Sequence, residues 1–217
     1  AQVDFGSADF YENGRLYSGK YLNLSFPSSN AGYIQLFKGE NMECLLEGLV
    51  AIFKRIGGAP HRLWFDNTST IVTKVLKEGH RDLTDKFLRF KGHYGFTAVF
   101  CNPDAGNEKG NVENKVGYHR RNMLVPIPEV KDLETYNRYL LKKSEEDHDR
   151  AHYRYDQSIA ERHKEDLKEL LPLPTAEFDC ARYEVYSVNL WGKFNIGPAH
   201  TYSTSPKHAG GKVTVKI

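Results

Sequence analysis

The stretch Gln2-Val3-Asp4-Phe5-Gly6 decides the fold, because it reads as a core strand that carries one carboxylate. The stretch Leu63-Trp64-Phe65-Asp66-Asn67 repeats the arrangement, with an aspartate at the edge of a second apolar run. A third acidic residue, Glu113, lies at the start of a helix-like stretch. An aspartate in an apolar strand is costly to bury without a partner, so two such aspartates favour a shared counter-ion. The pattern predicts a carboxylate cluster that binds a divalent metal.

A pair of Mg²⁺ ions is the counter-ion that suits this cluster. Two such ions roughly 3.5–4 Å apart serve in-line phosphoryl displacement and require hard oxygen ligands. Any one acidic residue is more often a cap, a turn or a solvated surface group, so the prediction rests on the combination. Glu108 competes with Glu113 for the third position. We favour Glu113, because we expect it within a rigid helix and Glu108 in a glycine-bearing loop.

The composition is that of an ordinary globular protein and excludes few classes. The chain has 217 residues, 40% of them hydrophobic and 27% charged, with a formal net charge of +2. This length leaves room for a main core and a smaller module. The small net charge neither demands nor excludes DNA, because a local basic face is what binds phosphate. No apolar run approaches the roughly 20 residues of a membrane span, so we expect no membrane association.

Cysteine usage and the chain ends bear on the setting of the protein. Cys44, Cys101 and Cys180 are far apart and lack Cys-x-x-Cys spacing, which fits reduced thiols in a cytosolic protein. The chain has no initiating Met and no signal segment, and it stops within a strand-like alternation. We expect an excised piece whose C-terminal cut falls inside a folded unit.

The first 128 residues alternate between strand-like and helix-like patterns. Asn13-Gly14 predicts a hairpin turn, residues 15–26 and 31–38 read as strands, and an amphipathic helix from Met42 should stop at Gly57-Gly58. Further expected elements are a strand at 62–65, a helix at 82–90, a strand at 96–101 and a helix at 112–123. This order predicts an α/β domain with a mixed five-stranded sheet flanked by helices, as in RNase H-like folds.

The rest of the chain divides into a connector and a small β domain. Residues 129–171 are helical and charged, and Ser158 begins a capping box. From Pro172 the pattern alternates in short strands separated by glycine turns. We therefore predict domains at 1–128, 129–171 and 172–217, the last a small β-barrel truncated at its C-terminus.

Other chemistries find little support in the residues. His148 and His152 stand four apart on a helical stretch, but no Cys pair or third His accompanies them at zinc-finger spacing. Gly106 and Gly110 are not followed by Gly-Lys-Ser or Gly-Lys-Thr, so they form no phosphate-binding P-loop. Cys44 has no evident His partner, which leaves covalent catalysis without support.

Six short motifs resemble the DDE transposase and retroviral integrase superfamily, and most closely the IstA-type insertion-sequence transposases that work with an AAA+ helper ATPase. The motifs are Gln2-Val3-Asp4-Phe5-Gly6, Phe65-Asp66-Asn67, His93-Tyr94-Gly95-Phe96, Cys101-Asn102-Pro103, Lys109-Gly110-Asn111-Val112-Glu113 and Gly117-Tyr118-His119-Arg120-Arg121-Asn122. The resemblance covers nearly the whole chain. It departs from the usual pattern at residues 103–110 and at Asn114, which bears on DNA contacts but leaves the carboxylates in place.

The resemblance implies a catalytic triad, cofactors and partners. The metal-binding triad falls on Asp4, Asp66 and Glu113, with two Mg²⁺ ions per site and Mn²⁺ as a substitute. The implied activity is cleavage of transposon ends and joining of their 3′-hydroxyls to target DNA. The implied partners are transposon-end DNA, target DNA, further copies of the chain in a dimer or higher assembly, and the AAA+ helper ATPase. The implied location is the bacterial cytoplasm, on the nucleoid.

Basic residues around the third carboxylate are the expected DNA contacts. They are Lys109, Lys115, His119, Arg120 and Arg121. Such residues neutralise phosphates, although each taken singly fits a solvated helix face equally well.

Two other functions stay open at this point. One is a metal-dependent RNase H-like nuclease without strand transfer, and the other is a non-catalytic DNA-binding or assembly module with structural carboxylates.

Overall fold

The computed structural model describes residues 1–65, 72–75, 81–100 and 106–217, and the side chains at 72–75, 81–82 and 106–114 lie outside the description. Contacts within the chain divide it into two compact units, Ala1–Phe178 and Asp179–Ile217. The segment 129–171 therefore groups with the first unit. The finer division at residues 128 and 171 stays a prediction.

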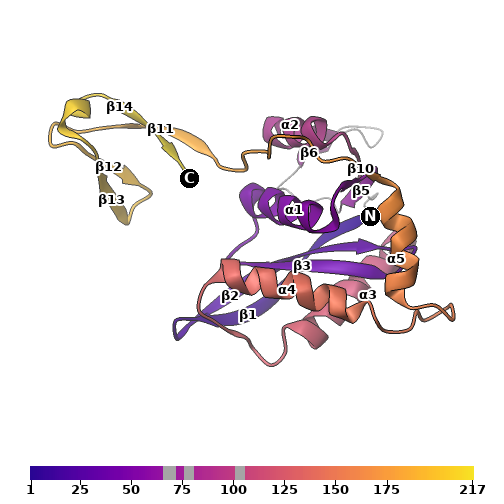
Figure 1. Ribbon diagram of the computed structural model, residues 1–217. Coiled ribbons are helices and arrows are strands. Elements are labelled where there is room, and N and C mark those ends of the chain that lie inside the picture. The colour runs from indigo at the N-terminus through magenta and orange to yellow at the C-terminus, as the bar shows by residue number, and fades with distance from the viewer. Residues whose placement is uncertain (66–71, 76–80, 101–105) are drawn as a thin grey trace. The chain divides into compact units, whose positions relative to one another are not determined.

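The first unit alternates strands and helices along the chain (Figure 1). Its described elements are β1 (Gln2–Glu12), β2 (Arg15–Phe26), β3 (Ala31–Phe37), α1 (Met42–Ile56), β4 (Ala59–Pro60), β5 (Arg62–Phe65), β6 (Val72–Val75), β7 (Arg81–Leu83), α2 (Asp85–Tyr94), β8 (Thr97–Phe100), α3 (Gly106–Met123), β9 (Glu129–Val130), α4 (Leu133–Asp147), α5 (Ile159–Lys168) and β10 (Leu170–Leu171).

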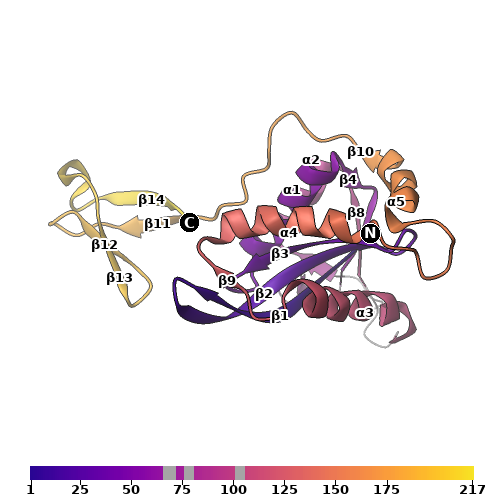
Figure 2. The same ribbon diagram turned by 60° about the horizontal axis from the view of Figure 1, so that its bottom comes forward.

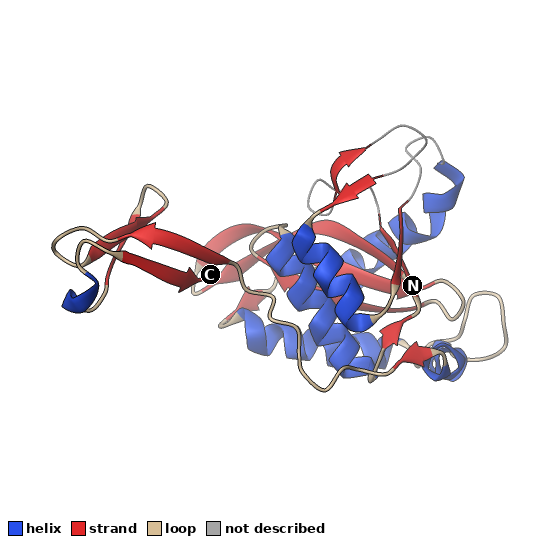
Figure 3. Ribbon diagram, turned by 90° about the horizontal axis from the view of Figure 1, so that it is seen from above, coloured by secondary structure: helices blue, strands red, loops and turns tan. Residues whose placement is uncertain are grey.

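One mixed sheet forms the centre of this unit, with strand order β3-β2-β1-β5-β8. The pairs β3–β2 and β2–β1 are antiparallel, while β1–β5 and β5–β8 are parallel. The predicted five strands are thus present, and the two-residue strand β9 adds a sixth beside the far end of β1. Figure 3 shows the strands of this sheet with helices on both sides. The predicted mixed α/β sheet with flanking helices is confirmed.

Local signals set several element ends as expected. Asn13 (φ 50°) and Gly14 (φ 76°) form the hairpin turn between β1 and β2, since both residues tolerate positive φ. Asn41 caps α1 by accepting a hydrogen bond from the Cys44 amide, and Gly57 (φ 81°) ends that helix in the left-handed conformation. The helix predicted at 82–90 begins later, because the Thr84 side chain caps α2 and residues 81–83 form β7.

The helices cover the two faces and one edge of the sheet. Helix α1 packs against β2 and β3, while α3 packs against β1 and β2. Helix α4 runs along β3, as Figure 2 shows. There Asn137 accepts a hydrogen bond from the Leu36 amide (2.6 Å) and donates one to the Leu36 carbonyl (2.9 Å). These bonds satisfy backbone groups at the outer edge of β3, which would otherwise be open to pairing with another chain.

The second unit holds four short strands and one 3-10 helix at Pro206–His208. The strands are β11 (Tyr183–Ser187), β12 (Lys193–Ile196), β13 (His200–Ser203) and β14 (Lys212–Lys216). They form two separate two-stranded sheets, β11–β14 and β12–β13. The predicted small β-barrel is not confirmed, because in the residues described no ladder joins the two sheets into a closed ring.

Candidate functional site at strands β1 and β5

Asp4 lies in the first half of β1 and is half-buried. Its carboxylate oxygen Oδ1 accepts a hydrogen bond from the Phe5 amide at 2.8 Å. Asn23 of β2 is its direct neighbour in the antiparallel ladder. Asp4 thus occupies a central strand of the sheet, as the sequence predicts.

The parallel ladder between β1 and β5 joins the segments that precede two of the predicted carboxylates. Gln2 pairs with Trp64 and Val3 pairs with Phe65. Asp4 follows Val3, and Asp66 follows Phe65 in the sequence but lies outside the described residues. Within the described part of the chain, no group of three or more His, Cys, Asp or Glu side chains is arranged to hold a metal ion.

Strand alternation assigns Asp4 to the face of the sheet that α3 covers. Side chains two residues apart on a strand point to the same face, so Asp4 shares its face with Ala8 and Phe10. Both of those residues belong to the buried cluster that includes Met123, at the end of α3. Helix α3 is the element that carries Glu113, so the first and third predicted carboxylates belong to facing elements.

Gly6 brings α3 close to β1, because it leaves room for the Tyr21 ring. A Cβ atom at Gly6 would lie 2.2 Å from Cζ of Tyr21 and 2.3 Å from its hydroxyl oxygen. With no side chain in the way, the Tyr21 ring crosses β1 and its hydroxyl donates to the Val116 carbonyl of α3 at 2.8 Å. The glycine of the Gln2–Gly6 motif therefore serves the docking of α3.

Charged groups of β1 and α3 affect the pKa of the Tyr21 hydroxyl. Burial is the main cause that raises the pKa of Tyr21 to about 12. Arg120 and Arg121 lower this pKa, while Asp4 raises it. The first predicted carboxylate and two of the predicted DNA-contacting arginines thus act on the same side chain.

Lys115 and His119 lie inside the molecule, so the predicted contact of these two residues with DNA does not fit the structure. Lys115 is 5% exposed, and its ammonium donates to the Asn30 carbonyl at 2.6 Å. His119 is fully buried, and its Nδ1 lies 2.6 Å from the Asn23 side-chain oxygen. Burial lowers the pKa of Lys115 to about 8 and holds that of His119 well below its usual value. Both residues attach α3 to β2 and to the turn that follows it.

Gly32 in β3 is the residue of the sequence that could have predicted this docking. A Cβ atom at Gly32 would lie 2.5 Å from Cε1 of His119 and 3.0 Å from Cε of Lys115. Glycine inside an apolar strand often marks close approach of another element. Together with the four-residue spacing of Lys115 and His119 on one helix face, Gly32 could have predicted that these side chains point inward.

Arg120 and Arg121 are exposed near the end of α3 and are free to meet a phosphate backbone. The side chain of Lys109 lies outside the described residues. Of the five predicted DNA contacts, two are therefore exposed and two are buried.

Helix α3 also changes the comparison between Glu113 and Glu108. The helix begins at Gly106, so both glutamates belong to it, and the expectation that Glu108 lies in a loop is wrong. The choice of Glu113 over Glu108 therefore stays a prediction.

The histidines of α4 and α5 take part in packing. Nε2 of His148 lies 3.1 Å from both the amide and the carbonyl of Gly32. His163 meets the Tyr33 hydroxyl through Nε2 at 3.1 Å and Asp166 through Nδ1 at 3.1 Å. These bonds fix the helical segment 133–168 against β3.

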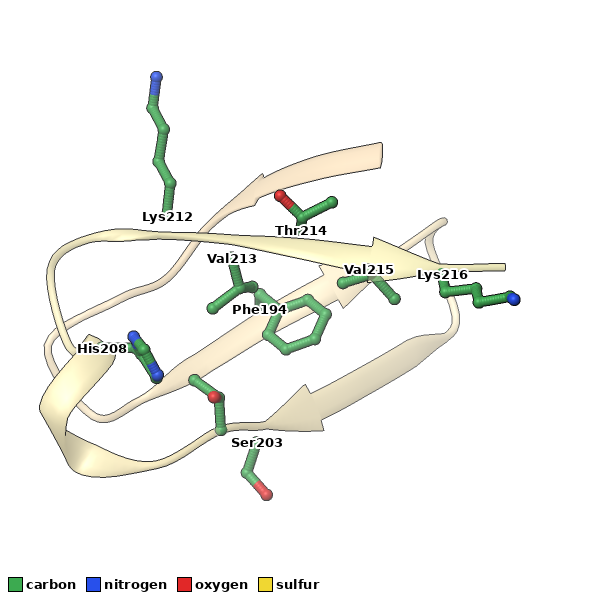
Figure 4. Close-up of a pocket in the computed structure, with 9 residues that line it drawn as sticks. Phe194, Ser203, His208, Lys212, Val213, Thr214, Val215 and Lys216 are labelled. Atoms are coloured by element: carbon green, nitrogen blue, oxygen red, sulfur yellow. The ribbon is translucent and has the colours of Figure 1, made fainter. Parts of the chain in front are cut away.

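The second unit contains an open hollow of about 540 Å³ between β13 and β14 (Figure 4). Phe194, Val213 and Val215 turn toward it, whereas Lys212 points away. None of the described residues that line it is acidic. Since phosphoryl transfer by hard metal ions needs oxygen ligands, this hollow does not provide a second catalytic candidate.

Comparison with known proteins gives a consistent assignment. No protein-family model matches the chain. It is 29% identical over 178 residues to the transposase for insertion sequences IS1326/IS1353 of Pseudomonas aeruginosa, covering 79% of this chain and 35% of that protein. It is 24% identical over 206 residues to the transposase for insertion sequence element IS21 of Pseudomonas aeruginosa, covering 92% of this chain and 52% of that protein. The chain thus spans about half or less of the length of these curated relatives.

The fold has a solved counterpart. A chain in the cryo-EM structure of the simian T-cell lymphotropic virus intasome in complex with PP2A regulatory subunit B56 gamma matches with a TM-score of 0.51 and 14% identity, covering 87% of this chain and 62% of that one. No helix in the described residues combines the length and the apolar character of a membrane span. The resemblance predicted from the motifs is confirmed: the chain is similar in sequence to insertion-sequence transposases and in fold to a chain of a retroviral intasome.

Proposed function

We propose that the chain is the catalytic part of a DNA transposase. It cleaves the ends of a transposon and joins their 3′-hydroxyls to target DNA. Water first hydrolyses the phosphodiester at the transposon end and frees its 3′-hydroxyl. This hydroxyl then attacks a phosphodiester of the target, so that a new phosphorus–oxygen bond forms, the target's P–O3′ bond breaks and the target 3′-hydroxyl leaves. Neither step needs a covalent protein intermediate, so the protein contributes positioning and charge neutralisation.

The parallel pairing of Val3 with Phe65 is the observation that supports this proposal best. Each of these residues directly precedes a proposed carboxylate in the sequence. Helix α3, which contains position 113, packs on β1. Strand alternation assigns the Asp4 side chain to the face of the sheet that α3 covers. The similarity to insertion-sequence transposases supports the same three positions.

Asp4, Asp66 and Glu113 are the residues that would hold the metal. All three offer carboxylate oxygens, the donors that Mg²⁺ and Mn²⁺ prefer, and Asp4 sits half-buried on a rigid strand. When bound, two such ions activate the attacking oxygen and stabilise the leaving one. Arg120 and Arg121, exposed on α3, neutralise phosphates of the DNA that enters the site.

The similarity also supports proposals about the whole protein. We infer that it binds transposon-end DNA and target DNA, assembles as a dimer or higher oligomer, and receives its target from an AAA+ helper ATPase. It works in the bacterial cytoplasm, on the nucleoid. The two arginines on α3 fit the DNA part of this proposal, since they supply local positive charge in a chain whose net charge is only +2.

Strand transfer by the full-length protein tests the proposed chemistry. Wild type is compared with Asp4→Asn, Asp66→Asn, Glu113→Gln and Glu108→Gln on pre-cut transposon-end DNA with Mn²⁺. Asp9→Asn is the matched control, because Asp9 is an exposed aspartate on the same strand β1. We expect the first three variants to lose joined product by at least about a hundredfold, while Asp9→Asn and Glu108→Gln keep it.

Metal binding, measured by calorimetry without DNA, provides a second readout. The three proposed ligand variants should weaken Mn²⁺ binding, and the controls should not. Loss of activity in Glu108→Gln but not in Glu113→Gln would assign the third ligand to Glu108. Wild type that only nicks DNA would favour a nuclease, and wild type that neither binds Mn²⁺ nor reacts would favour a non-catalytic DNA-binding module.

A further inference from the structure

The loop between α4 and α5 carries exposed aromatic rings interleaved with arginines. Its tip reads His152-Tyr153-Arg154-Tyr155-Asp156. Tyr153 is 59% exposed and Tyr155 is 48% exposed, while the neighbouring His152 is buried. Exposed aromatic rings next to cations are the arrangement with which proteins bind unpaired nucleic acid.

The loop is held in one shape by its own hydrogen bonds. Ala151 and Ser158 form an isolated antiparallel bridge, and the His152 amide donates to the Gln157 carbonyl at 3.0 Å. The Arg154 amide donates to Nδ1 of His152 at 3.0 Å. These bonds order the backbone before any ligand arrives, which lowers the entropic cost of binding.

The rings of the loop form a packed group. The His152 ring stacks on Tyr153, with centroids 4.6 Å apart and an interplanar angle of 25°, and lies 4.9 Å from the Tyr155 ring. On Tyr155, the Arg162 guanidinium carbon sits 3.8 Å from the ring centroid. Tyr153 is therefore backed by a buried ring while more than half of its own surface faces solvent. Such a ring offers a flat, fixed surface on which a base can stack.

Arg154 supplies a cation beside this surface. Its guanidinium carbon lies 5.5 Å from the centroid of the Tyr153 ring. The neighbouring Arg150 is paired with Asp147, with Nε 3.2 Å from Oδ2. The loop as a whole is electrically balanced, because Asp149 and Asp156 offset Arg150 and Arg154. Stacking must therefore provide most of the affinity, with one nearby phosphate contact.

The loop is joined to the helix that carries the proposed catalytic glutamate. The Tyr118 hydroxyl of α3 donates to Asp147 at 2.5 Å, and the Arg150 guanidinium carbon lies 4.6 Å from the centroid of the Tyr118 ring. Figure 2 shows the loop at the same end of the first unit as the beginning of α3. These contacts tie the loop to α3, the helix that contains position 113.

We propose that Tyr153 and Arg154 bind an unpaired DNA strand next to the catalytic site, with a base stacked on the Tyr153 ring and a phosphate beside Arg154. This inference rests on the proposed function for its choice of DNA. An interface with a second copy of the chain is the competing use of the same surface, and the test below separates the two.

The test measures binding of the full-length protein to a dye-labelled single-stranded oligonucleotide without divalent metal. Tyr153→Ala should weaken binding about 5- to 100-fold, while Tyr153→Phe, which keeps the ring, should stay within about twofold of wild type. Arg154→Ala should lower the slope of log affinity against log salt concentration by about 0.7. Tyr139→Ala is the matched control, since Tyr139 is a 49% exposed tyrosine on α4.

An abasic oligonucleotide of the same length separates stacking from backbone contacts. Tyr153→Ala should bind it as tightly as wild type does, because only the base contact is lost. Equal loss on both oligonucleotides, or no loss on either, would overturn the proposal. A change of oligomeric state in Tyr153→Ala at unchanged DNA affinity would assign the surface to protein association instead.

The same variants distinguish this inference from the proposed chemistry. Asp4→Asn should bind the unpaired strand like wild type even though it cannot join DNA ends. If wild type fails in strand transfer but the base-dependent effect of Tyr153→Ala persists, the catalytic proposal fails and the stacking surface stands. The reverse result removes the stacking surface alone.

Discussion

Replacing Gly6 by alanine should weaken the docking of α3 on the sheet, because the new methyl group would occupy the space of the Tyr21 ring. A Cβ atom only 2.2 Å from Cζ of Tyr21 overlaps the ring too deeply for a shift of a few tenths of an ångström to relieve. Tyr21 is 1% exposed, so its ring has no solvent-filled space to move into. The ring must leave its position or β1 must bend.

The cost follows from the contacts involved. Overpacking a buried site costs about 1–3 kcal/mol, and loss of the Tyr21–Val116 hydrogen bond adds about 1 kcal/mol. Alanine favours a strand over glycine by roughly 0.5–1 kcal/mol, which offsets part of this cost. We therefore expect Gly6→Ala to lower the free energy of unfolding by about 1–3 kcal/mol, measured by urea denaturation followed by circular dichroism.

A double-mutant cycle with Tyr21→Leu tests the cause. Leucine lacks the atoms that a methyl group at position 6 would strike, so in that background Gly6→Ala should cost almost nothing. Tyr21→Phe serves as the matched control, since it keeps the ring and loses only the hydroxyl. If Gly6→Ala costs the same with leucine as with tyrosine at position 21, the steric argument is wrong.

Three further predictions concern the packing of α4. Burial, followed by the charge of His163, lowers the pKa of His148 to about 4, below its unfolded value. The stability contributed by neutral His148 is therefore complete above about pH 6.5 and is lost as the pH falls toward 4. His148→Gln should flatten this part of a pH series of denaturation curves. Asn137→Ala removes both side-chain bonds to Leu36 and should cost about 1–3 kcal/mol, with faster amide exchange at the β3 edge. Arg55→Ala breaks only the exposed pair with Glu145 and should change stability by less than about 1 kcal/mol, measured by the same urea denaturation.

The sequence predicted those parts of the fold that short-range patterns specify. The Asn13-Gly14 turn, the ends of α1 and the capping box of Ser158 with Glu161 all depend on residues within one turn of each other. Their backbone preferences are intrinsic to the residue types and need no distant partner. The order of strands and helices in the first unit followed from these elements.

Long-range pairing explains most of what the sequence missed. Strand β10 pairs with β4, more than a hundred positions earlier, and two residues are too few to show an alternation. The barrel expected after Pro172 is not confirmed for a similar reason, since alternation predicts strands but not the ladders between them. The catalytic triad is a different case, because Asp66 and the side chain of Glu113 lie outside the described residues and stay predictions.

The polar residues of α3 show why composition misassigned two DNA contacts. A lysine and a histidine on a helix usually mark its solvated face, but Lys115 and His119 make buried bonds to Asn30 and Asn23. Apolar packing alone would hold a helix against a sheet while tolerating small slips along its axis. Directional bonds at 115, 116 and 119 fix the helix in one register, since a shift by one turn would move it about 5.4 Å and break all three. The proposed site, which would combine Asp4 on β1 with Glu113 on α3, requires a fixed register between these two elements.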